Sequence, residues 1–151
     1  MKNGLNVLKI VLCGLMLAAL AAPVHARDTV HMLSIQAAMN TPEAQQRLDP
    51  SIRFIFADAP HGRVTAEHGN FVSNKKTNAF GKSDQDACNW VMLSALLTFQ
   101  DRVRAEGGNA VINIENFYQQ NPNPSRTEFE CHAGAIMAGV ALRGDVVTLA
   151  D

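Results

Sequence analysis

The stretch SDQDACNWVMLSALLTFQDRVRAEGGNAVINI, residues 83–114, carries the strongest structural signal in this chain. Ser83 is suited to cap a helix over 84–106, acidic residues occupy the first turn, and two glycines follow the end. Apolar side chains recur within it at spacings of three and four, so they share one face of the helix. These side chains are Cys88, Met92, Ala95, Leu96, Phe99 and Val103. The stretch therefore predicts a helix that buries this face against other elements.

Alternating apolar residues on both sides of this helix predict strands. One strand follows it at 109–114, and another precedes it at 51–56. The residues expected on the inward side are Ala110, Ile112 and Ile114 in the first strand, and Ile52, Phe54 and Phe56 in the second. Each strand would thus offer an apolar side to the helix.

The C-terminal part of the chain is also expected to be extended, over 127–143, with 146–149 as a final edge strand. The apolar alternation changes parity near Gly134, which predicts a bulge or turn there. The inward residues are Phe129, Cys131 and Ala133 before the change, and Ile136, Ala138, Val140 and Leu142 after it.

The remaining segments carry weaker signals. A short extended segment is expected at 29–33, and Thr41 followed by Pro42 predicts a short helix that ends near Leu48. The polar region 61–82 is expected to be a loop with short strands at 63–66 and 70–73. The simplest assembly is an α+β domain in two layers, one long helix packed on a small antiparallel sheet, over residues 27–151.

Residues 1–26 resemble a secretory signal peptide. Lys2 and Lys9 precede an uncharged, largely apolar run at 10–22, and Val24-His25-Ala26 predicts cleavage after Ala26. The alternative is an N-terminal membrane anchor, but as a helix the run would cover only about 20 Å of a hydrocarbon core of about 30 Å. We therefore expect a periplasmic or secreted protein with no stable membrane span after cleavage.

Three cysteines occur in the full chain, and Cys13 would leave with the signal peptide. Cys88 and Cys131 would remain, both directed inward, so a disulfide between them is expected in an oxidising compartment. The alternative is a redox-sensing pair, which requires exposed thiols with a lowered pKa. The apolar surroundings of Cys88 favour a structural disulfide that links the helix to the sheet.

The residues of 84–143 resemble the RcsF family of envelope stress sensors and the related YbjQ-like domains. The resemblance lies in Cys88 on a long helix, the strand start at 107–111, Cys131, and the stretch 139–142. It implies that Cys88 and Cys131 form one of the two disulfides of that family, that the role is stress-related binding, and that the partners are envelope proteins. Asn116 and Met137 occupy the positions of the second pair, and the lipidation motif is missing.

The whole chain, including 74–78 and 130–135, is also similar to small exported bacterial proteins labelled as an excinuclease ATPase subunit. Gly81-Lys82-Ser83 before a helix is the only part of a phosphate-binding loop present, because Lys76 stands where the first glycine is required. Nucleotide hydrolysis is therefore not expected. Lys75, Lys76 and Lys82 near the helix N-terminus are weak candidates for an anion site.

Other functional signals are sparse. The 13 basic and 14 acidic residues show no basic excess, which argues against nucleic-acid binding. His61 and His68, with Glu67 between them, are weak candidates for a zinc or heavy-metal site, although solvated loop histidines are the more common case. No catalytic residue or cofactor is expected. The sequence thus predicts an exported, non-catalytic binding module, with metal binding or an uncharacterised enzymatic activity as alternatives.

Overall fold

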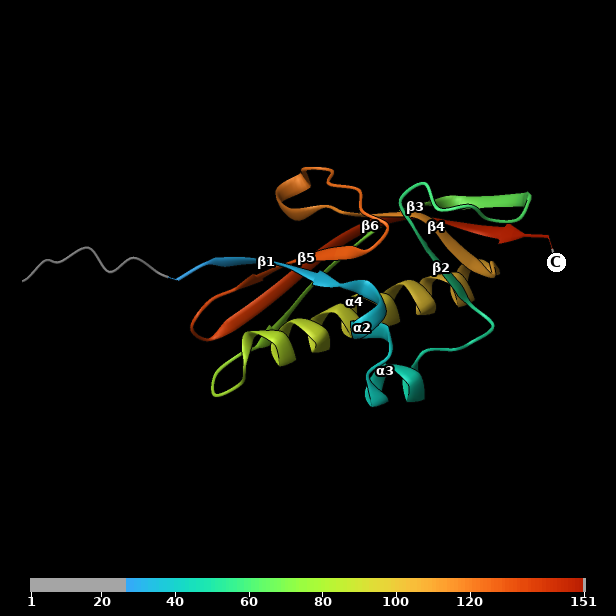
Figure 1. The fold of residues 1–151 in the computed structure, drawn as a ribbon. Helices are drawn as coiled ribbons and strands as arrows, with labels where there is room; N and C mark the ends of the chain where they lie inside the picture. Colours follow the sequence, from blue (N-terminus) through green and yellow to red (C-terminus); the bar gives the residue numbers. More distant parts are fainter. Residues whose placement is uncertain (1–26, 151) are drawn as a thin grey trace, which may run out of the picture.

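The computed structural model describes residues 27–150 (Figure 1). The expected signal peptide, residues 1–26, and its cleavage after Ala26 lie outside the described residues. The helices are α2 (Ile35–Met39), α3 (Pro42–Arg47), α4 (Asp84–Glu106) and the 3-10 turn η1 (Tyr118–Gln120). The strands are β1 (Thr29–Ser34), β2 (Arg53–Phe56), β3 (Val64–Asn78), β4 (Ala110–Asn116), β5 (Glu128–Ala133) and β6 (Met137–Leu149). Within 27–150, no helix is both long and apolar enough to span a membrane.

All six strands form one sheet, with β6 at its centre. Along its whole length β6 pairs with β3, while β5 and β4 pair with its first and second halves in tandem. Outside these, β1 pairs with β5, and β2 pairs with β4. Every pairing is antiparallel except that of β2 with β4. The helix α4 lies across one face of this sheet, which confirms the expected two-layer α+β fold (Figure 1).

The long helix has the expected bounds. The Ser83 hydroxyl accepts a hydrogen bond from the Asp86 amide, and Gly107 ends the helix in the left-handed conformation. All six side chains of the predicted face are buried, together with Ala87 and Val91. The short helix α3 also begins as expected, because Thr41 caps it and Pro42 is its first residue.

The expectation of a loop over most of 61–82 is wrong, because β3 runs without a break from 64 to 78. Its inward positions include Ser73, Lys75 and Thr77, so the chain shows no apolar alternation there. Pairing with β6 makes this segment a strand, and the Ser73 hydroxyl donates a hydrogen bond of 3.0 Å to the carbonyl of Ala95 in α4. A bulge between Glu67 and Gly69 adjusts the register.

Two further expectations about the C-terminal part need correction. The segment 146–149 is the end of the central strand β6, not an edge strand, because both β3 and β4 pair with it. The turn near Gly134 is present between β5 and β6, but Ile136 lies in that turn and is exposed. Ala138, Val140 and Leu142 are buried as expected.

The inward side of 109–114 also differs from the prediction. Val111 and Ile114 pack in the core under α4, whereas Ala110 and Ile112 pack on the opposite face with Val147. The register with β6 shifts between Ile112 and Glu115, and Asn113 has φ of 54°. This irregularity changes the parity, so that Ile114 lies on the same side as Val111.

Candidate functional site

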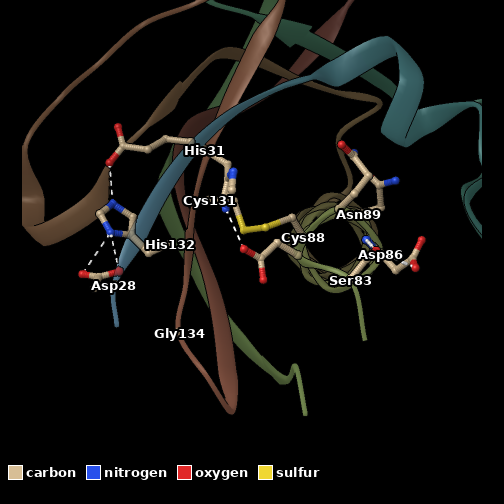
Figure 2. Close-up of a disulfide and its surroundings, with 12 residues drawn as sticks. Asp28, His31, Ser83, Asp86, Cys88, Asn89, Cys131, His132 and Gly134 are labelled. Atoms are coloured by element: carbon tan, nitrogen blue, oxygen red, sulfur yellow. Dashed lines mark hydrogen bonds and ion pairs between the residues drawn. A yellow bond between two sulfur atoms is a disulfide. The ribbon is translucent and has the colours of Figure 1, made fainter. Parts of the chain in front are cut away.

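A disulfide joins Cys88 of α4 to Cys131 of β5 (Figure 2). The Cα atoms are 5.9 Å apart, and both cysteines are fully buried. The predicted link between the helix and the sheet is therefore present. Its burial is typical of a structural disulfide rather than a redox sensor, and the bond fits an extracellular or periplasmic location.

An ionic contact lies beside the disulfide. His31 of β1 is the register partner of Cys131, and its Nε2 lies 2.9 Å from a carboxylate oxygen of Asp84, the first residue of α4. Arg27 donates a second hydrogen bond of 2.7 Å to this carboxylate. Hydrogen bonds from Arg27 and then from His31 lower the pKa of Asp84 below its usual value. These contacts connect the edge strand β1 to α4.

On the other face of the sheet, His132 lies in a cluster of polar and aromatic groups. Figure 2 shows its ring pointing away from the disulfide and toward Asp28. Its Nδ1 lies 3.3 Å from Asp28, its Nε2 lies 2.8 Å from Glu130, and the ring of Tyr118 stacks on it at 3.4 Å between centroids. Burial raises the pKa of Glu130, but the hydrogen bonds from His132 and Asn123 outweigh this, so the pKa is lowered overall.

A shallow depression of about 290 Å³ adjoins this cluster. Tyr118 and His132 line one part of it, and Lys76, Met137 and Gly139 line another. Both ring nitrogens of His132 face carboxylates, so in this arrangement the side chain is held in place by its neighbours rather than presented to a ligand. The lining also includes Arg27 and Asp28, so the depression combines two aromatic rings, two cationic groups and one carboxylate.

Sequence reasoning placed Glu130 and His132 on the outward face but missed Asp28 and Tyr118. Asp28 precedes β1, and Tyr118 lies in the connection after β4. Neither segment has a periodic pattern that would point to His132. The only available signal is a general one, that tyrosine in a polar connection often packs its ring on a neighbouring side chain.

The two candidate metal ligands, His61 and His68, contact different groups. His61 is exposed before β3, and its Nδ1 lies 2.8 Å from the carbonyl of Gly62. His68 lies at the β3 bulge, where its Nε2 is 2.8 Å from the Thr148 hydroxyl. Within residues 27–150, no three His, Cys, Asp or Glu residues are grouped so that they could hold a metal ion.

The three candidate anion-binding lysines do not converge. Lys75 and Lys76 are adjacent in β3 and point to opposite faces of the sheet. The Lys82 ammonium group donates a hydrogen bond of 3.1 Å to the Asn78 carbonyl. Ser83 caps α4 and also donates to the Asp86 carboxylate. The segment Gly81-Lys82-Ser83 thus forms a turn that leads into a capped helix.

No family model, curated protein or solved structure matches this chain. The fold and the site therefore define it by class, as an α+β domain whose long helix is linked to its sheet by a buried disulfide.

Proposed function

We propose that this chain is an exported envelope protein that acts by binding other proteins and has no catalytic centre of its own. In this proposal, residues 1–26 direct export and are removed after Ala26, and the remaining chain works in the periplasm or outside the cell. The stress-related role implied by the resemblance of residues 84–143 to the RcsF family is the model proposed for its activity.

The observation that carries the proposal is the disulfide combined with exposed apolar side chains on the sheet face opposite α4. A buried Cys88–Cys131 bond is stable in an oxidising compartment and is rare in the cytosol. The helix α4 covers one face of the sheet, whereas Val30, Met32 and Val72 lie exposed on strands of the other face. Exposed apolar side chains on a rigid sheet are suited to protein contact.

The contacts of His132 favour a binding role over a catalytic one. His31, His61, His68 and His132 each have a partner within hydrogen-bond distance. A general base has to reach a substrate proton at such a distance, and among the four histidines only His132 has partners at both ring nitrogens. An enzymatic function that used His132 would require one of its contacts to open.

The proposal can be tested by crosslinking in living cells. A photoreactive amino acid replaces the exposed Met32 on the sheet face opposite α4, and a control chain carries it at Asp101 on the exposed side of α4, where the side chain is 78% accessible. We expect a discrete adduct with another envelope protein from position 32 and none from position 101. Adducts from neither position, or equal adducts from both, would contradict the proposal.

Export is tested separately by the intact mass of the protein isolated from the envelope fraction. We expect a chain that begins at Arg27 and is lighter by two hydrogen atoms than the reduced chain because of the disulfide. A chain that begins at Met1, or that is recovered from the cytoplasm, would contradict this part of the proposal.

A further inference from the structure

His132 lies beside two of the exposed apolar side chains on which the proposed function depends. Val30 of β1 is the register partner of His132 in β5, and Met32 is the register partner of Glu130. Register partners in an antiparallel pair project from the same face of the sheet. Val30 and Met32 therefore lie next to an imidazole and a carboxylate on the face opposite α4.

The contacts of the His132 ring join three segments of the chain. Its Nδ1 lies 3.3 Å from Asp28, which directly precedes β1 (Figure 2). Its Nε2 lies 2.8 Å from Glu130 in β5. The ring of Tyr118, in the connection between β4 and β5, stacks on it at an interplanar angle of 11°. One imidazole thus holds the start of β1 and this connection against the sheet.

These contacts depend on the charge of the imidazole, and histidine ordinarily changes its charge between about pH 5 and pH 8. An imidazolium donates through both ring nitrogens, whereas the neutral ring has only one N–H group. A neutral ring that keeps the shorter contact, with Glu130, turns an unprotonated nitrogen toward the Asp28 carboxylate, and the two repel each other. The stack on Tyr118 also weakens, because a cation is attracted to the face of an aromatic ring. The contact with Asp28 therefore forms at acid pH and is lost as the pH rises.

The other groups around the ring keep one charge state over most of this pH range. Lys76 from β3 and Arg27 from the chain start line the adjoining depression, and lysine and arginine side chains stay cationic there. The phenol of Tyr118 stays neutral. From β6 the depression is lined by the uncharged residues Met137, Ala138 and Gly139. Removal of residues 1–26 would add one titratable group, the α-amino group of Arg27, next to Asp28 in the sequence.

We propose that His132 is a pH-dependent switch that regulates protein binding at the face of Val30 and Met32. At acid pH the imidazolium fixes Asp28, so that the start of β1 is held in one conformation. At higher pH this contact opens, and the start of β1 becomes mobile. A fixed strand loses less conformational entropy on binding, so the partner binds more tightly at acid pH. This inference rests on the proposed function, because it assigns regulation to the face that is proposed to bind.

Hydrogen exchange measured by NMR tests the switch without any partner. Protection factors of the β1 amides, corrected for the pH dependence of intrinsic exchange, are compared at about pH 5 and about pH 8. His132→Gln keeps a donor and an acceptor but cannot be protonated. The matched control is His31→Gln, which alters the histidine that contacts Asp84 on the other face of β1. Asp28→Asn removes the exposed carboxylate and leaves His132 in place.

We expect protection of β1 to fall about threefold from the lower to the higher pH in the unmodified chain and in His31→Gln. In His132→Gln and in Asp28→Asn we expect no such fall. An unchanged fall in these two variants would overturn the switch, because the α-amino group of Arg27 would then be responsible. A fall that disappears only in His31→Gln would overturn it as well.

Crosslinking from position 32 then tests the link to binding. Cells are suspended at the same two pH values, and the adducts are compared between the unmodified background and His132→Gln. We expect more adduct at the lower pH in the unmodified background and equal amounts at both pH values in His132→Gln. Equal amounts in both backgrounds would overturn the regulation. Absence of adducts at either pH would contradict the proposed function, whereas hydrogen exchange would still decide whether the switch exists.

Discussion

His31 and Asp84 form a side-chain hydrogen-bond contact of 2.9 Å that ties the edge strand β1 to the first residue of α4. The register partner of His31 is Cys131, whose disulfide reaches the same helix one turn further on. A covalent link and a hydrogen-bond contact therefore lie side by side between the sheet and the start of α4. The helix start is held from β5 and from β1 at once.

The disulfide should account for a large share of the stability. Its sequence separation of 43 residues corresponds to about 4 kcal/mol in the loop-entropy model. Cys88→Ala combined with Cys131→Ala should lower the free energy of unfolding in urea by roughly this amount. Reductant should lower the stability of the unmodified chain but leave the double variant unchanged. Equal unfolding midpoints for the oxidised chain and the double variant would show that the bond contributes nothing.

The Asp84 carboxylate offers a direct test of the contacts beside the disulfide. Arg27 is the larger cause of its lowered pKa and His31 the smaller one. Arg27→Gln should therefore raise the pKa of Asp84 more than His31→Ala does, as measured by the carboxyl chemical shift in NMR titrations. The pKa of Asp58, which depends on Arg126, is an internal control and should stay constant. The reverse order of the two shifts would contradict the geometry.

Asp49 should make stability depend on pH in the acid range. Hydrogen bonds from Ser51 and then from Arg104 lower its pKa from 3.8 to about 2. Because the pKa is lower in the folded state, the charged form stabilises the fold at pH values above 3.8, and this contribution is lost as the pH falls toward 2. In urea unfolding, the difference between the unmodified chain and Asp49→Asn should therefore shrink below about pH 4. A difference that is independent of pH would rule out this role for the carboxylate.

Gly144 should not tolerate a side chain. A Cβ atom there would lie 2.7 Å from Cγ1 of Val111 and 3.2 Å from Cγ1 of Ile114. Gly144→Ala should therefore destabilise the protein by about 1–3 kcal/mol in urea unfolding. Gly139→Ala in the same strand is the matched control, because its nearest neighbours would be 3.6 Å away and stability should stay the same or rise slightly. Similar losses from both variants would indicate a general effect of alanine in β6.

The metal-binding alternative predicts that zinc affinity depends on the candidate histidines. The affinity for zinc is measured by calorimetry for the unmodified chain and for the His61→Ala and His68→Ala variants. Each histidine has its own partner in the fold, Gly62 for His61 and Thr148 for His68. We therefore expect neither substitution to lower the affinity of the chain for zinc. Tight binding that is lost in both variants would instead support the metal-binding function.

The helix could be predicted from the sequence because its signals are local. The disulfide could be predicted because few cysteines are available to pair. The Ser83 cap, the acidic first turn and the glycine end lie within a turn of the residues they affect. Only two cysteines remain after residue 26, so only one disulfide within the chain is available. The predicted short strands at 63–66 and 70–73 cover only parts of β3. Its full length could not be predicted, since Ser73 and Lys75 hide its alternation and only the neighbouring strand β6 makes it regular.

The sequence by itself determined the bounds of α4, the buried face of that helix and the inward direction of Cys88 and Cys131. These features follow from helix capping, from the interaction of charged side chains with the helix dipole, and from the periodicity of apolar residues. All three act between residues close together in the chain. Only the tertiary structure decided that β6 is central, that Tyr118 stacks on His132, and that Phe80 and Ile136 share one end. Those relationships depend on which strands pair across long stretches of chain, and local propensity does not specify that pairing.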